Sequence, residues 1–270
     1  MVATTWDEVE EAIAEAVAAG KLADWRNKLP SHKTKRFRQR LFPGDILGDC
    51  THHNGSANQD PRPTASYHVG PNHISETGCP GICYTAGISQ IYEPDKVLLF
   101  RPFQDATWSQ DKPTKGHEEW AGDENRHLCS TLVFGDFDED WRKGKSGSPS
   151  ASQLDRWLWW MEWKAELFGY GPRGRFGHYH FGKSACPGRV LRHQIESARA
   201  GVVSLTDLEW QQALLRWDLY CLPKYGADGI WGYESKRALV AFERAHKHRV
   251  DGMQDPFTEL LLARKYPAIP

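Results

Sequence analysis

Hydrophobic and polar positions follow a helical period at the start of the chain. The apolar residues at this three- and four-residue spacing are Trp6, Val9, Ile13, Ala16 and Val17. Thr5 and Glu8 have the spacing of a capping box, and Gly20 fits a helix stop. The pattern predicts an amphipathic helix over residues 5–19.

Short apolar runs in the middle of the chain predict strands of a central sheet. The run over residues 45–50 leads into Thr51, His52, His53 and Asn54, as in a buried strand that delivers polar side chains at its C-terminal end. Similar strand patterns occupy residues 82–91, 97–100 and 128–134. The Pro- and Gly-rich residues 61–80 are typical of an irregular loop.

A strongly apolar segment, Gln153–Phe168, predicts a long helix after a Gly- and Ser-rich surface loop over residues 142–152. Its four tryptophans are Trp157, Trp159, Trp160 and Trp163. Since helical positions differ by about 100° per residue, these side chains cover more than one face. That distribution favours burial in the core over an exposed glycan-binding surface.

The pattern changes after residues 198–205. Asp228-Gly-Ile-Trp-Gly and Val250-Asp-Gly-Met form a loose internal echo, and each is followed by a helical pattern. The two helices after the motifs are expected over residues 236–246 and 257–265. Another helix is expected before them, over residues 205–220. The prediction is an α/β domain with a mixed central β-sheet and flanking helices, plus a small C-terminal three-helix module.

Charge and composition exclude several classes of protein. The 270 residues carry 34 Lys and Arg against 35 Asp and Glu, so no net charge attracts nucleic acid or an anionic membrane. No run approaches the roughly 18 apolar residues of a membrane span, and the first 20 residues are acidic where a signal peptide is basic and then apolar. We therefore expect no nucleic-acid partner, no membrane insertion and no secretion signal. The basic residues 32–40 are expected to form a solvated face.

Two clusters contain residues suited to metal chemistry: His52-His53, and the segment Gly177-His-Tyr-His-Phe-Gly-Lys-Ser-Ala-Cys-Pro-Gly188. Two imidazoles and one thiolate suit zinc, and three protein ligands leave a fourth tetrahedral position for a water that attacks an amide carbonyl. Spacing alone is equally compatible with core histidines and a small buried cysteine. Six cysteines in a chain of this length do not indicate a disulfide scaffold.

The order of these motifs resembles the zinc-dependent N-acetylmuramoyl-L-alanine amidases of the type-2 group, which includes phage endolysins and peptidoglycan recognition proteins. The resemblance covers roughly residues 45–191, and Gly-His-x7-Cys-Pro-Gly is its most specific part. The C-terminal echo is similar to a peptidoglycan-binding three-helix module. His-His-Asn-Gly-Ser-Ala-Asn-Gln-Asp looks most like lysins of phages that infect mycobacteria. The resemblance implies an N-terminal helical segment (1–40), a catalytic domain (41–200) and a peptidoglycan-binding domain (204–270).

The resemblance implies a ligand set for zinc. Its pattern places the metal on His52, His178 and Cys186, with His53 as a neighbour. His180 is a second candidate ligand, because His178 and His180 would point to the same face of a strand.

The resemblance also implies which residues assist the reaction. Tyr84 matches a tyrosine that orients water or hydrogen-bonds the oxyanion in phage-type amidases. The family's Lys or Thr two residues before the last ligand is Ser184 here, so either Lys183, after a one-residue slip, or Ser184 stabilises the tetrahedral intermediate. Another branch uses a Glu where this chain has Leu132, which argues against that arrangement.

The expected function is that of a monomeric endolysin that cuts the amide between N-acetylmuramic acid and L-alanine of peptidoglycan. It would stay in the host cytoplasm until a pore opens the membrane. One alternative is an amidase that recycles soluble muropeptides, which has no use for a wall-binding module. The other is a recognition protein without catalysis, a class that usually lacks one metal ligand, whereas Cys186 is present.

Overall fold

The computed structural model describes residues 2–110, 124–137, 139–140, 145–171, 174–183, 185–199, 206–245 and 262. The chain divides into two compact units, Met1–Ile195 and Glu196–Pro270. Each is described by itself below. None of the described helices is long and apolar enough to cross a membrane.

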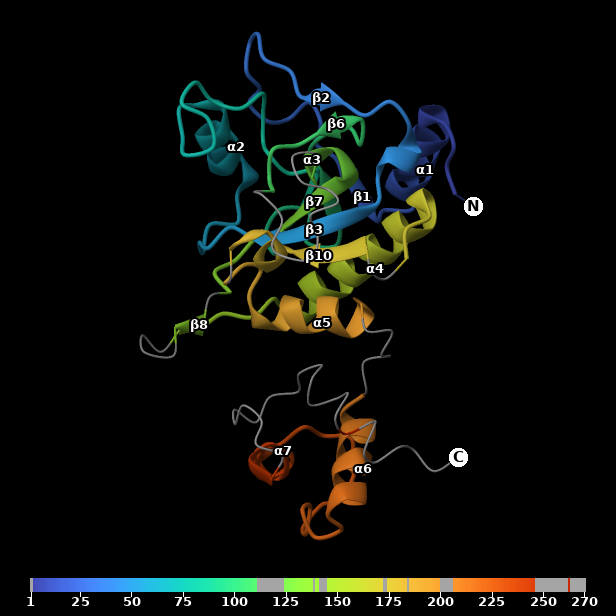
Figure 1. Cartoon of the computed structure of the whole chain (residues 1–270), viewed down its shortest axis with the longest axis vertical. Coiled ribbons are helices and arrows are strands. Elements are labelled where there is room, and N and C mark those ends of the chain that lie inside the picture. The colour runs from blue at the N-terminus through green and yellow to red at the C-terminus, as the bar shows by residue number, and fades with distance from the viewer. Residues whose placement is uncertain are drawn as a thin grey trace. The chain divides into compact units, whose positions relative to one another are not determined.

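The larger unit is built on a six-stranded mixed sheet in the order β1-β5-β4-β7-β3-β10 (Figure 1). The strands are β1 (Leu22–Asp24), β5 (Val97–Leu99), β4 (Ala86–Ile88), β7 (Leu128–Val133), β3 (Gly48–His53) and β10 (Arg175–Gly177). Only the β4–β5 pair is antiparallel, and the other four pairs are parallel. Two further pairs lie outside this sheet: β2 (Arg38–Gln39) with β6 (Asp105–Ala106), and β8 (Glu139–Asp140) with β9 (Lys145–Ser146).

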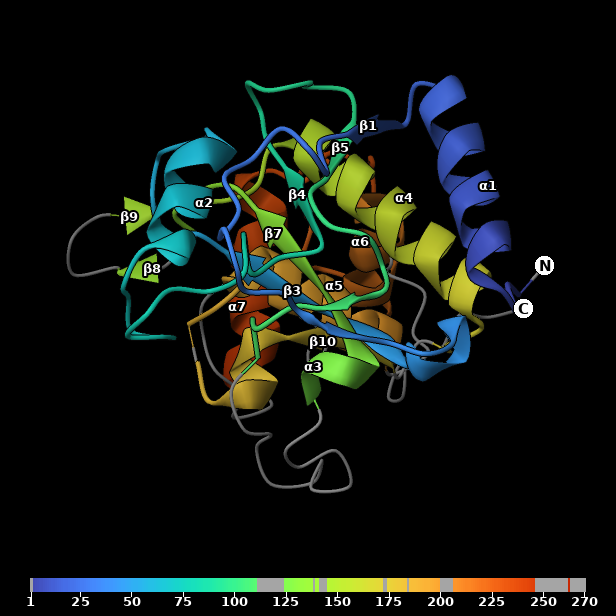
Figure 2. The same cartoon turned by 90° about the horizontal axis from the view of Figure 1, so that it is seen from above.

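Helices cover both faces of the sheet, which confirms the predicted fold class (Figure 2). On one face α1 (Trp6–Ala18), α4 (Ala151–Phe168) and α5 (Arg189–Arg199) contribute to the largest apolar core. On the other face α2 (Pro61–Val69) contributes Ala65 to a second core with the aromatic rings of Phe100 and Phe134. The sheet is also flanked by the short helices η1 (Pro43–Asp45), α3 (Glu124–His127) and η5 (His178–Phe181).

The N-terminal helix has the predicted capping box, in which Thr5 accepts a hydrogen bond from the Glu8 N–H. The segment that follows it adds β1 to the edge of the sheet, where Leu22 pairs with Val97. The first 40 residues, assigned to a separate helical segment from the sequence, thus lie in the same compact unit as the sheet.

Two expectations about this unit are wrong. The predicted loop over residues 61–80 contains α2, because Pro61 and Pro63 occupy the first turn, where proline is tolerated, and Asp60 caps it by accepting from the Arg62 N–H. The basic residues 32–40 are not solvated throughout, because Arg40 is buried. Its guanidinium donates to backbone carbonyls of five residues, Phe103, Asp105, Asn125, Arg126 and Leu128.

The smaller unit contains α6 (Asp207–Trp217) and α7 (Tyr233–Ala245), which pack around Trp210, Leu214, Leu239 and Phe242. Leu262 is also buried in this core. The rest of the third predicted helix, over residues 257–265, and the Val250-Asp-Gly-Met echo lie outside the described residues.

Candidate metal centre

The parallel pairing of β10 with β3 brings two distant histidines together. Gly177 pairs with Thr51, so the next residues along the two strands are His178 and His52. Asp49 and Thr51 of β3 face α4, since they bond to Lys164 and Trp157 of that helix. Alternation along the strand therefore directs His52 to the opposite face of the sheet.

The two imidazoles and the Cys186 thiol form one cluster. The Nδ1 atoms of His52 and His178 lie 3.0 Å apart, and ligand atoms of His52, His178 and Cys186 all lie within 4.8 Å of one another. Two nitrogen ligands of a tetrahedral zinc, each about 2.0–2.1 Å from the metal, are about 3.3 Å apart. The cluster therefore has the residue types and the spacing of three zinc ligands.

Burial of His52 favours the neutral form of its imidazole, which is the form that can bind a metal ion. His52 is buried, and its pKa is well below the ordinary value because of that burial and, next, the neighbouring His178. Its imidazole is therefore neutral near pH 7, which is the form that binds metals. Its Nε2 is buried and has no hydrogen-bond partner within the part of the chain that the structure describes. The nitrogen that faces His178 is Nδ1, so Nδ1 is the atom that this ring offers to a metal.

The Cys186 thiol is held by the backbone around it. Its Sγ accepts a hydrogen bond from the His53 N–H at 3.3 Å, which stabilises a thiolate. Its own N–H donates to the Lys183 carbonyl at 2.9 Å, and its carbonyl accepts from the Tyr179 N–H at 3.0 Å. Gly188 ends the motif with φ +89° and would clash with Phe137 if it carried a Cβ, so only glycine fits here.

Tyr84 lies beside the cluster, with its ring centroid 5.1 Å from that of His52. It comes just before β4, not within it as the predicted strand over residues 82–91 implied. Burial, followed by the charge of Cys186, raises the pKa of Tyr84. The phenol therefore stays protonated across the neutral range and can donate a hydrogen bond there.

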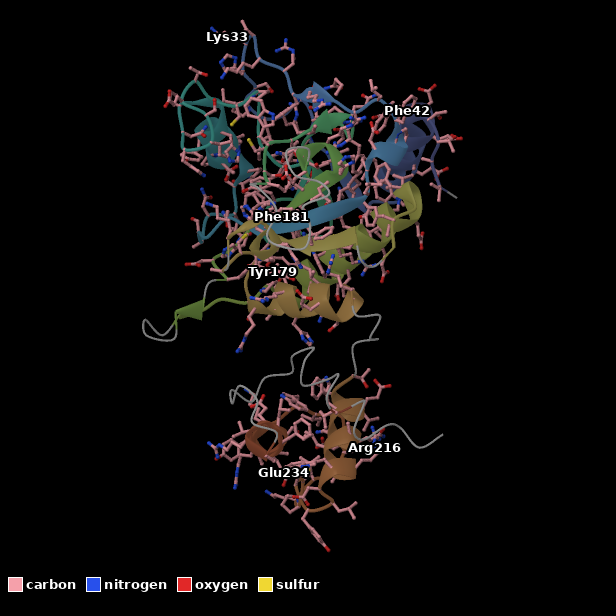
Figure 3. The ribbon with its side chains drawn as sticks, viewed as in Figure 1. Lys33, Phe42, Tyr179, Phe181, Arg216 and Glu234 are labelled. Atoms are coloured by element: carbon pink, nitrogen blue, oxygen red, sulfur yellow. The ribbon has the colours of Figure 1, made fainter. Side chains whose placement is uncertain are left out.

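The other residues that the sequence suggested for the site, His180, Lys183 and Ser184, lie between His178 and Cys186 in the chain. Residues 178–181 form η5 and not a strand, so His178 and His180 do not share a strand face. His180 Nδ1 instead accepts a hydrogen bond from the Gly177 N–H at 3.3 Å. Lys183 has an exposed side chain, and Ser184 lies outside the described residues. In Figure 3, Tyr179 and Phe181 mark this turn, and Phe181 is buried.

His53 and His68 support the cluster from outside it. His53 Nδ1 accepts from the Phe137 N–H at 3.1 Å, which places this imidazole on the face opposite His52. His68, on α2, is buried with its ring 5.5 Å from that of Tyr84, and its Nδ1 accepts from the Cys83 N–H. These tertiary contacts have no signal in the sequence. Leu132, at the position of the Glu in the other family branch, is buried in β7 opposite His52.

The helix beneath β3 makes polar contacts directly under the site. The indole N–H of Trp157 donates to Thr51 Oγ1 at 3.0 Å, and that of Trp160 donates to Thr131 Oγ1 at 2.9 Å. Lys164 forms a fully buried ion pair with Asp49. Trp157 and Trp160 are buried, as the sequence predicts, while Trp159 and Trp163 are partly buried against the same core.

Comparison with known proteins gives structural similarities only, since no family model and no curated protein matches the chain. The N-acetylmuramoyl-L-alanine amidase LysC from Clostridium intestinale URNW is 14% identical over 68% of this chain and 99% of its own, with a TM-score of 0.46. The Ph2119 endolysin from the Thermus scotoductus MAT2119 bacteriophage is 15% identical over 66% and 99%, with a TM-score of 0.47. Drosophila PGRP-LB is 18% identical over 69% and 98%, with a TM-score of 0.44. These values leave the function to be argued from the side chains of the site.

Proposed function

We propose that the protein is a zinc-dependent N-acetylmuramoyl-L-alanine amidase that hydrolyses the amide between N-acetylmuramic acid and L-alanine of peptidoglycan. The observation that carries the proposal is the cluster of His52, His178 and Cys186 around one point. These three residues would hold the zinc. When bound, zinc polarises the substrate carbonyl and lowers the pKa of water, so that water becomes a nucleophile near neutral pH.

The side chains around the cluster would perform the rest of the reaction. Tyr84, 5.1 Å from His52 between ring centroids, would donate a hydrogen bond to the oxyanion as negative charge develops on the carbonyl oxygen. The His53 N–H would orient the Cys186 sulfur. Lys183 would add positive charge at the rim of the site, as an exposed side chain in the turn between the ligands.

The smaller unit would hold the enzyme on its insoluble substrate. Residues 204–270 are assigned to wall binding, which raises the local concentration of cleavable bonds. This combination suits a monomeric endolysin of the type found in phages of mycobacteria, which lyses the host after release from the cytoplasm. An amidase for soluble muropeptides would gain nothing from such a unit.

Digestion of purified insoluble peptidoglycan tests the reaction. We expect new L-alanine amino termini, without new sugar reducing ends, that disappear with a chelator and return with zinc. If the protein sediments with the wall but no bond is cut, the function is that of a recognition protein.

Replacing one ligand tests the metal centre. Cys186→Ala should lower bound zinc from one equivalent to nearly none and abolish cleavage, as metal analysis and amino-terminal assay would measure. Cys221→Ala is the matched control, because Cys221, like Cys186, is a half-buried cysteine outside any disulfide. Full activity in Cys186→Ala would mean that the ligand assignment is wrong.

A further inference from the structure

Two buried cysteines lie next to each other outside the metal cluster. Cys79 and Cys83 are separated by Pro80, Gly81 and Ile82, in the segment between α2 and β4. The exposed fractions of the two cysteines are 0% and 1%, and neither belongs to a disulfide. Nothing in the proposed hydrolysis uses their thiols.

A hydrogen bond joins the two sulfur atoms. The Cys83 thiol donates to the Cys79 sulfur, and the Gly81 carbonyl lies 3.8 Å from the donating sulfur as a second, weaker acceptor. The side-chain amide of Asn72 donates to the Cys79 sulfur at 3.9 Å. The two thiols therefore face each other, as the partners of a disulfide must.

The backbone on both sides of this turn is held by one residue of α2. The Cys79 N–H donates to the His68 carbonyl at 2.7 Å, and the Cys83 N–H donates to His68 Nδ1 at 3.2 Å. The Pro80 carbonyl between them accepts from the His32 N–H at 2.9 Å. These bonds keep the two backbone positions close, so a bond between the sulfur atoms requires mainly rotation of the two side chains.

The two thiols differ in how easily they ionise. The hydrogen bond from Cys83 lowers the pKa of Cys79 in spite of the burial of this group, and Asn72 lowers it further. The same hydrogen bond requires the Cys83 proton, so this contact and burial raise the pKa of Cys83. Lys35 adds a positive charge nearby, since its ammonium bonds to the Gly78 carbonyl just before Cys79. Because the thiolate is the nucleophile, Cys79 is the thiol that reacts first.

A turn at the surface lies next to the Cys79 sulfur. It spans residues 71–77, contacts the sulfur through Asn72 and is closed by a hydrogen bond from the Asn72 N–H to the Ser75 carbonyl at 3.0 Å. Five of its seven residues are exposed. Segments with few buried contacts open locally without unfolding of the core. A small reagent can therefore reach Cys79 while the sheet stays folded.

We propose that Cys79 and Cys83 are a reactive dithiol that closes to a disulfide when it meets a low-molecular-weight disulfide. The Cys79 thiolate attacks one sulfur of the reagent, which forms a mixed disulfide and releases the first thiol. The Cys83 sulfur then loses its proton, attacks the Cys79 sulfur and expels the second thiol.

This exchange balances without any other reactant. The reagent disulfide is reduced to two thiols, the two cysteines are oxidised to one disulfide, and the protons of the cysteines end on the released thiols. The pair should stay reduced in a reducing compartment and close in an oxidising one. The proposal does not rest on the proposed function.

Peptide mapping of the folded full-length protein tests the proposal. The protein is incubated with glutathione disulfide, the remaining thiols are alkylated, and the peptides are analysed by mass spectrometry. We expect the peptide with both cysteines to lose two hydrogen atoms and take no alkyl group, and dithiothreitol to restore both thiols. Cys50 and Cys129 are the matched controls, because they are equally buried. Their thiols are hydrogen-bonded to Gln110 and Thr85, so both should stay reduced.

Single variants test the order of the two steps. In Cys83→Ala, Cys79 should be trapped as a mixed disulfide with glutathione, because no second thiol displaces it. In Cys79→Ala, Cys83 should react about tenfold more slowly than Cys79 does in the other variant, because its thiolate is scarcer. Thermal unfolding at the wild-type temperature would show that each variant is folded.

The wild type alone can overturn the proposal. Two alkyl groups on the Cys79–Cys83 peptide, after an exposure that fully oxidises dithiothreitol under the same conditions, would mean that the pair is not reactive. A disulfide that forms only in urea would also contradict the proposal, because the folded chain would then not promote it. Neither result depends on a cleavage assay, so the hydrolase proposal and the dithiol proposal can fail separately.

Discussion

At the scale of single residues, strand pairing brings the side chains of the candidate metal site together, and backbone hydrogen bonds orient them. His52 and His178 are neighbours because Gly177 pairs with Thr51, and Cys186 joins them through a turn closed by backbone hydrogen bonds. The backbone N–H of His53 donates a hydrogen bond to the Cys186 sulfur. Substitution of a proposed ligand should therefore remove metal and activity together, whereas substitution of a neighbouring side chain should affect activity alone.

The variant Tyr84→Phe should lower the rate of cleavage without lowering the zinc content. We expect kcat to fall by about 10²- to 10³-fold because one oxyanion donor is lost, while zinc content stays at the wild-type value. The measurement is steady-state cleavage of a soluble muropeptide together with metal analysis. Tyr92→Phe is the control, since Tyr92 donates to Asp60 at the start of α2 and not to the site. A Tyr84→Phe enzyme with the wild-type kcat would remove Tyr84 from the reaction.

The sequence predicts three candidate metal ligands but not what orients them. His52, His178 and Cys186 stand in motifs whose residue types suggest zinc, and the structure places the three side chains together. The sequence favours His178 but leaves His180 as a second candidate, because the end of the strand at Gly177 and the tight turn after it are seen only in the structure. The hydrogen bond from the His53 N–H to sulfur joins residues 133 apart in the chain, which no local pattern records.

At the scale of elements, the helices that bear on the site differ in how well their sequences predict them. The helix α4 has a clear apolar pattern with the capping residues Ser150 and Gln153, so its start is predictable within a few residues. The helix α2 was missed because its two prolines suggest a break, although the first helical turn accommodates them. The strand β4 is shorter than its apolar pattern, since Ile82 is buried by tertiary contacts outside the sheet.

The ion pair between α4 and β3 gives a stability prediction. Lys164→Met should lower the free energy of unfolding by about 3–5 kcal/mol, because the Asp49 carboxylate stays buried without its partner. Urea denaturation would measure the loss, and adding Asp49→Asn should recover part of it. Lys96→Met, which breaks the exposed pair with Glu93, should cost no more than about 1 kcal/mol. Equal losses in the two lysine variants would contradict this account.

The pH dependence of the free energy of unfolding should reflect the protonation of His68, which lies on α2. Burial lowers the pKa of His68 from 6.5 to about 4, so between these values the unfolded chain binds a proton that the folded chain does not. Stability conferred by the neutral imidazole is present above pH 6.5 and decreases as the pH falls towards 4, by about 3 kcal/mol at most.

Comparison of wild type with His68→Gln in denaturant titrations between pH 4 and 7.5 isolates this effect. The pKa of His52 is lowered as well, so only the difference between the two curves belongs to His68. The variant should lose stability less steeply below pH 6.5. Parallel curves would mean that His68 is protonated in the folded protein.

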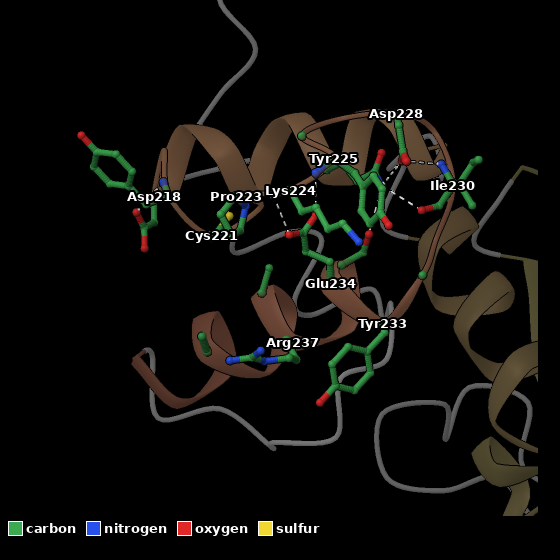
Figure 4. Close-up of a pocket in the computed structure, with 17 residues that line it drawn as sticks. Asp218, Cys221, Pro223, Lys224, Tyr225, Asp228, Ile230, Tyr233, Glu234 and Arg237 are labelled. Carbon is green, nitrogen blue, oxygen red and sulfur yellow. Dashed lines mark hydrogen bonds between the residues drawn. The ribbon is translucent and has the colours of Figure 1, made fainter.

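At the scale of the whole molecule, the chain combines a larger unit that contains the histidine and cysteine cluster with a smaller helical unit. The two compact units divide at Ile195 and Glu196, each with an apolar core of its own. The change in sequence pattern after residues 198–205 is visible without a structure because the small unit uses helical periods and turn glycines throughout. The conformation of the loop over residues 218–232 was not predictable, since it is held by hydrogen bonds to Glu234 and Gln211 that no local pattern records (Figure 4).

Removal of the smaller unit should slow cleavage of insoluble peptidoglycan but not of soluble muropeptides. A chain that ends after residue 204 should cut soluble muropeptides with unchanged kcat/KM but act about 10²-fold more slowly on insoluble peptidoglycan, because it loses the second attachment. Release of L-alanine amino termini from both substrates provides the comparison. An undiminished rate on the insoluble wall would mean that residues 205–270 do not serve attachment.

The pairing of β10 with β3 also has a consequence for synthesis. The two facing imidazoles are 126 residues apart, and the thiol lies further along the chain. A ribosome adds about 5–20 residues per second, so a nascent chain carries His52 for several seconds or more before His178 and Cys186 exist. A chain that ends before Cys186 lacks at least one of the three proposed ligands. Any activity that depends on all three therefore begins only when the larger unit is nearly complete. Truncated translation products that contain His52 but neither His178 nor Cys186 would therefore lack this cluster.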